Sequence, residues 1–72
     1  MTLAQQYRQE GRQEGILASR RQDVLEALEI RFARVPEGLR ETVEAINDEA
    51  KLRTLHRAAI QCNSVEEFAA SI

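Results

Sequence analysis

The chain reads LASRRQDVLEALEIRF from residue 17 to residue 32. Apolar residues recur in this stretch at intervals of three, four and seven, which is the spacing of an amphipathic helix. The residues that form its apolar face are Leu17, Val24, Leu28 and Phe32, with Ile16, Leu25 and Val35 beside it. The intervals from residue 17 to residue 28 also match a short coiled-coil seam. The stretch predicts an all-α fold whose first helix runs from about Leu3 to Ala33.

Pro36 sets the boundary after this helix. The residue before a proline avoids the α region, so Val35 is expected to leave the helix. Pro36 itself suits the first position of a second helix, which is predicted to run to about Ile46. The apolar face of that helix consists of Leu39, Val43 and Ile46.

Two more helices are predicted beyond residue 46. Asn47 or Asp48 is expected to cap a third helix, and Asn63 suits the left-handed position after its end. Ser64 and Glu67 form a capping box, which starts a short last helix that ends near residue 71. The residues expected to be buried by these two helices are Leu52, Leu55, Ala59, Ile60 and Phe68, with Val65 and Ile72. The predicted architecture is a long N-terminal helix followed by a compact cluster of three to four helices, in an oligomeric protein.

The first half of the long helix carries the tetrapeptide RQEG twice in tandem, at residues 8–11 and 12–15. Four residues are close to one helical turn, so Gly11 and Gly15 lie on the same side of the helix. Each glycine costs about 1 kcal/mol of helix stability relative to alanine. Either the pair admits the close approach of a second helix, which we favour, or it forms a flexible spacer. Its neighbours are strong helix formers rather than the serines or prolines of a spacer.

Length and charge restrict the classes of function. A chain of 72 residues forms one domain with a small core, for which oligomerisation is a common source of stability. The net charge of −2 argues against a dedicated binder of nucleic acids or anionic membranes. Residues 1–21 carry a net charge of +2 and residues 22–50 one of −5. We divide the chain into a polar assembly arm, residues 1–22, and a small helical domain, residues 23–72.

No group of residues has the spacing of a catalytic or metal site. His56 is the only histidine and Cys62 the only cysteine, and six helical residues place them on roughly opposite faces. Cys62 is expected to fill the core or to remain a free surface thiol, which fits a reducing, cytosolic compartment. Carboxylate pairs such as Glu41 and Glu44 are expected on solvent faces. We expect no enzymatic activity, metal or cofactor, and no membrane span, since no apolar run approaches about 18 residues.

Several segments together resemble the C-terminal region of the Rpn proteins, bacterial recombination-promoting nucleases also known as YhgA-like proteins or putative transposases. The resemblance begins with the sequence MTLAQQ at residues 1–6 and the RQEG repeats. It continues through residues 24–32, 46–52, 56–59 and 64–68. The family has a PD-(D/E)XK nuclease core upstream of this region. Those catalytic residues have no match here, because Pro36 precedes Glu37 and Gly38 and Lys51 lacks the motif around it.

The resemblance implies a regulatory function without catalysis. Some members of the family encode a second product from an internal start, which consists of this tail and is thought to restrain the full-length nuclease. We therefore expect a homo-oligomer that also binds and inhibits a full-length Rpn-type nuclease. The alternatives are a plain oligomerisation module or remnant of a putative transposase, and a DNA-binding accessory helix. The residues expected at the assembly interface are Leu3, Tyr7, Gly11, Gly15, Leu17, Val24, Leu28 and Phe32.

Overall fold

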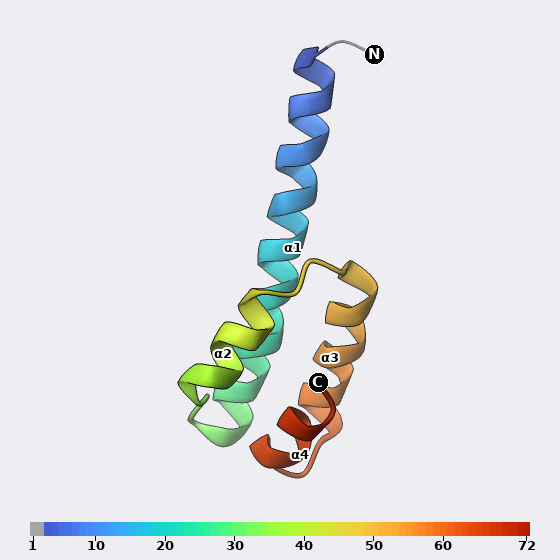
Figure 1. Ribbon diagram of the computed structural model, residues 1–72. Helices are drawn as coiled ribbons and strands as arrows, with labels where there is room; N and C mark the ends of the chain where they lie inside the picture. Colours follow the sequence, from blue (N-terminus) through green and yellow to red (C-terminus); the bar gives the residue numbers. More distant parts are fainter. Residues whose placement is uncertain (1–2) are drawn as a thin grey trace.

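The computed structural model describes the backbone of residues 3–72 and the side chains of residues 11–72. Within this part of the chain the secondary structure is entirely helical. The four helices are α1 (Leu3–Phe32), α2 (Glu37–Glu44), α3 (Glu49–Gln61) and α4 (Val65–Ala70), shown in Figure 1. The expectation of an all-α chain with a long first helix and a cluster of further helices is confirmed.

The helices α2 and α3 pack along the second half of α1, and α4 closes the far end of the body (Figure 1). The chain descends in α1, rises in α2 and descends again in α3, so α1 and α3 run parallel. Contacts from Arg20 to Glu49 and from Arg31 to Ala59 have the same direction along both helices. The first half of α1 projects beyond the body, and the molecule measures 47 × 19 × 18 Å.

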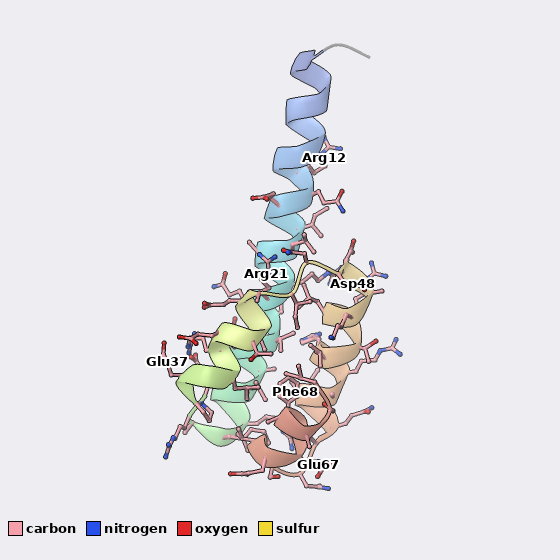
Figure 2. The ribbon with its side chains drawn as sticks, viewed as in Figure 1. Arg12, Arg21, Glu37, Asp48, Glu67 and Phe68 are labelled. Atoms are coloured by element: carbon pink, nitrogen blue, oxygen red, sulfur yellow. The ribbon has the colours of Figure 1, made fainter. Side chains whose placement is uncertain are left out.

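The core lies where the apolar faces of α1, α2 and α3 meet. Phe68, from the short α4, is fully buried at the end of this core, where the stick view in Figure 2 labels it. The other buried residues are Leu17, Val24, Leu25, Leu28, Leu39, Val43, Leu52, Leu55, Ala59 and Cys62. Burying a large aliphatic or aromatic side chain contributes about 1.5–3 kcal/mol, so this cluster is the main source of stability in the body.

Helix α1 ends one residue before the predicted Ala33, and Val35 lies outside the helices as expected. The helix ends at Phe32, and Ala33 adopts a left-handed conformation with φ of 59°. The amide of Ala33 still donates to the carbonyl of Glu29 at 2.8 Å, so the chain reverses directly after the last turn. Pro36 is the N-cap of α2 rather than its first helical residue. Its carbonyl accepts the first helical bond from the amide of Arg40 at 3.0 Å.

The caps of α3 and α4 agree with the sequence in their main features. The Asp48 carboxylate accepts bonds from the amides of Ala50 and Lys51 at 3.0 and 3.3 Å. The Ser64 hydroxyl accepts from the amide of Glu67 at 3.0 Å, as a capping box requires. The Glu67 carboxylate reaches back one residue further than expected, to the amide of Asn63 at 3.3 Å.

Three details of the predicted helices are wrong. Asn63 is not left-handed, because Ala33 alone among the described non-glycine residues has a positive φ. Ile60 was expected in the core, but 53% of it is exposed, because it lies to the side of the face that holds Leu52 and Leu55. Helix α2 ends at Glu44, so Ile46 packs against the core from the connection that follows rather than from the helix.

Candidate interaction surface

The first half of α1 stands clear of the body. We call residues 3–16 the projecting segment, because Leu17 is the first buried residue of the described side chains. Every side chain from residue 11 to residue 16 is exposed, including Ile16 at 41%. Figure 1 shows this segment as the blue part of α1 above the other helices. The surface of residues 11–16 is therefore open to another molecule.

The two glycines of the repeat face open space. A Cβ atom built at Gly11 or at Gly15 would have no atom within 4 Å, apart from its own helix backbone and chain neighbours. Helix α1 continues through both positions without a break, so they form no hinge in this conformation. Within one chain nothing explains why glycine stands at either position.

Half of the predicted interface residues serve another purpose. Leu17, Val24 and Leu28 are 8%, 0% and 0% exposed because they pack inside their own chain. This corrects the expectation that they face a partner, since buried side chains offer no surface to a second molecule. Phe32 is half-buried and also packs against the core. The apolar face of an amphipathic helix looks the same in sequence whether its partner is internal or external.

The other half of the predicted interface lies on the projecting segment. Leu3 and Tyr7 are in its helical backbone, and their side chains lie outside the described ones. Gly11 and Gly15 complete this set, and no atom of the body approaches them. Of the predicted interface residues, only those on the projecting segment therefore remain candidates for contact with a partner.

Residues 17–22 belong structurally to the body rather than to the projecting segment. Arg21 donates from Nε to the carbonyl of Ile46 at 2.8 Å and from Nη2 to Oδ1 of Asn47 at 2.6 Å. Arg20 lies 3.8 Å from the carboxylate of Glu49 at the start of α3. These contacts fasten α1 to the connection between α2 and α3. Sequence reasoning missed the role of Arg21. The only signal for it in the sequence is a basic residue beside an apolar helix face, and that signal is weak.

Arg31 fastens the other end of the body. Its Nη1 donates to the carbonyl of Ala59 at 2.8 Å and lies 3.5 Å from Sγ of Cys62. Carbonyls in the last turn of a helix lack intrahelical partners, and a cation there also favours the helix dipole. The guanidinium carbon lies 4.8 Å from the ring centroid of Phe32, which holds it against the apolar surface.

The residues weighed for chemistry do not converge. Cys62 is 6% exposed, and its thiol lies 3.7 Å from the carbonyl of Ala59. His56 is half-buried on another side of α3, where it borders a shallow surface hollow with Arg53 and Arg57. No group of histidine, cysteine and carboxylate residues with metal-binding geometry occurs among the described residues.

Comparisons with known proteins returned no match to any family model, curated protein or solved structure. None of the described helices combines the length and the apolar character that crossing a bilayer would require.

Proposed function

We propose that this chain is a non-catalytic assembly protein that associates through the projecting segment of α1. The chain associates with itself and also binds a full-length Rpn-type nuclease. By binding, the chain restrains cleavage of DNA by that nuclease. The sequence resemblance to the C-terminal region of that family supports the choice of partner. The surface chemistry supports association, because the described residues offer an open helix side rather than a site that encloses a substrate.

The projecting segment is the single observation that carries this proposal. Fourteen residues of helix, Leu3–Ile16, extend about 21 Å at 1.5 Å per residue. An isolated helix of this length is marginal in water even with good helix formers, and Gly11 and Gly15 weaken it further. A second helix packed on the glycine side would stabilise it, because small residues let two backbones approach closely.

Restraint of a nuclease would follow from mixed assembly. A chain that carries the shared helices but no nuclease domain can occupy one position in an oligomer of the full-length protein. Each such position replaces one catalytic domain, so an enzyme that needs two domains to cut two strands loses activity. This mechanism requires no chemistry from the present chain and no contact with DNA.

A paired substitution tests the projecting segment. The absolute mass of the purified chain, measured by light scattering over a concentration series, is expected to show a discrete oligomer. Gly11→Leu with Gly15→Leu is expected to lower the mass, because the leucines prevent close approach along the projecting segment. Leucine also favours helix over glycine, so loss of helix cannot explain this result. Gln9→Leu with Gln13→Leu has the same spacing on roughly the opposite side and serves as the control.

A binding and cleavage assay then tests the choice of partner. The cognate full-length nuclease is expected to bind the wild-type chain and to lose DNA cleavage as the chain is added. The glycine-to-leucine variant is expected to do neither, while the glutamine-to-leucine control behaves as wild type. Self-association without any effect on the nuclease would favour the plain oligomerisation module. A wild-type chain that is monomeric at all concentrations and does not bind the nuclease would exclude both the nuclease-restraining function and the plain oligomerisation module.

A further inference from the structure

The body carries two charged rows of opposite sign on its outer helix faces. The acidic row consists of Glu37, Glu41 and Glu44 on α2, at intervals of four and three residues. The basic row consists of Arg53 and Arg57 on α3, four residues apart. All five side chains are exposed, because each row lies opposite the buried face of its helix. Intervals of three and four place the members of each row about one turn apart.

These charges find few partners inside the chain. Among residues 11–72, none of the three glutamates of the acidic row takes part in an ion pair, and neither does Arg57. Arg53 lies 3.2 Å from Glu49 one turn earlier on the same helix, an exposed pair of the kind that contributes little to stability. Arg20 of α1 adds a third guanidinium beside the basic row, bordering the same hollow. Both rows are therefore available to another molecule.

We propose that the acidic row of α2 docks on the basic row of α3 in a second copy of this chain. Charge complementarity identifies the occupant, because the chain itself presents the opposite charges at the same one-turn spacing. A nucleic acid is a poorer partner, because the chain as a whole carries a net charge of −2. The proposal goes beyond the function proposed above, because it uses a different surface.

The arrangement of the rows determines how the copies assemble. Helices α2 and α3 pack on different sides of α1 (Figure 1). Each row lies opposite the buried face of its own helix, so the two rows lie on different faces of the body. Figure 2 shows Glu37 of the acidic row on the α2 side and Asp48 at the start of α3 on the other. Each copy uses α3 toward one neighbour and α2 toward another. Contacts of this head-to-tail kind extend the assembly unless the rotation between copies closes a ring.

Reciprocal charge reversal tests the contact. One variant carries Arg53→Glu and Arg57→Glu, and the other carries Glu41→Arg and Glu44→Arg. Sedimentation equilibrium in 50 mM NaCl is expected to show that each variant alone associates at least about tenfold more weakly than wild type. An equimolar mixture of the two is expected to recover the association, because each reversed row then meets its complement. Raising the salt to 500 mM is expected to weaken the wild-type assembly in the same way.

A control variant with the same change in net charge separates the proposed contact from a general effect of charge. Arg34→Glu with Lys51→Glu changes the net charge as much as the first variant, but at exposed residues outside both rows, and is expected to leave association unchanged. Circular dichroism confirms that each variant is folded. Variants that associate as wild type, or a mixture that does not recover, would overturn the proposed contact. Gly11→Leu with Gly15→Leu leaves both rows intact, so a salt-sensitive association in that variant isolates this contact from the one on the projecting segment.

Discussion

The two halves of α1 have the same secondary structure and different reasons for it. Residues 17–32 hold the apolar stripe that packs on α2 and α3, and Val24 and Leu28 are fully buried there. Residues 3–16 have no such stripe and receive no contact from the body at Gly11 or Gly15. The second half is helical because tertiary packing stabilises it, whereas the first half depends on intrinsic propensity and on what it can bind. A continuous helix can therefore contain one half that packs inside its own chain and another half that has no partner there.

The largest effect on the free energy of unfolding is expected from a core substitution in the packed half of α1. Leu28→Ala removes a side chain with 0% exposure, and such changes in cores cost about 2–5 kcal/mol through lost burial and a residual cavity. Urea unfolding followed by circular dichroism at 222 nm measures the loss. Because a chain of this size is marginally stable, the variant is expected to be substantially unfolded at 37 °C.

Ile30→Ala is the matched control on the same helix. Ile30 is 76% exposed, so its removal is expected to change the free energy of unfolding by less than about 0.5 kcal/mol. Equal losses at the two positions would contradict the assignment of the inner and outer faces of α1.

A smaller effect of opposite sign is expected at the end of the packed half. Ala33 has φ of 59°, a conformation that costs a residue with a side chain about 1 kcal/mol and costs glycine much less. Ala33→Gly is therefore expected to raise the free energy of unfolding by about 0.5–1 kcal/mol, the glycine's greater freedom in the unfolded chain offsetting part of the relief. Ala45→Gly, at an α2 end with φ of −84°, is the control and is expected to destabilise. If both glycine substitutions stabilise the protein, or if neither does, backbone strain at Ala33 is contradicted.

The sequence was sufficient for those parts of the fold that depend on local chemistry. The capping residues Asp48 and Ser64 start their helices as predicted, because a cap needs only its own side chain and the next two or three amides. Phe68 is buried as predicted, because a lone large aromatic residue on a short amphipathic helix has one way to leave water. Local rules of this kind do not require knowledge of the partner element.

The candidate surface was predictable only in part, for a physical reason. Leu17, Val24 and Leu28 form an apolar stripe that satisfies an internal and an external partner equally well, so periodicity alone assigned them to the interface. The long-range bonds of Arg21 and Arg31 depend on where α2 and α3 end against α1. Such registers are set by the packing of whole helices, which no short motif encodes.

The smallest effect on global stability is expected at the glycines, where the two halves of α1 should respond most differently. Gly11→Ala with Gly15→Ala adds about 1 kcal/mol of helix propensity per site, and the added Cβ atoms meet nothing within the chain. Global unfolding of the body is expected to shift by less than about 0.5 kcal/mol, because Gly11 and Gly15 make no contact with the body. In the monomer, amide hydrogen exchange of the projecting segment is expected to slow several-fold.

The same pair separates a free helix from a docked one. If a second backbone approaches at the glycines, even two methyl groups weaken association while they strengthen the helix, and the two measurements move in opposite directions. If the glycines are a spacer, helix propensity and association rise together or association does not change. The sign of the change in association, measured beside hydrogen exchange, therefore decides whether the unpacked half of α1 is built for contact.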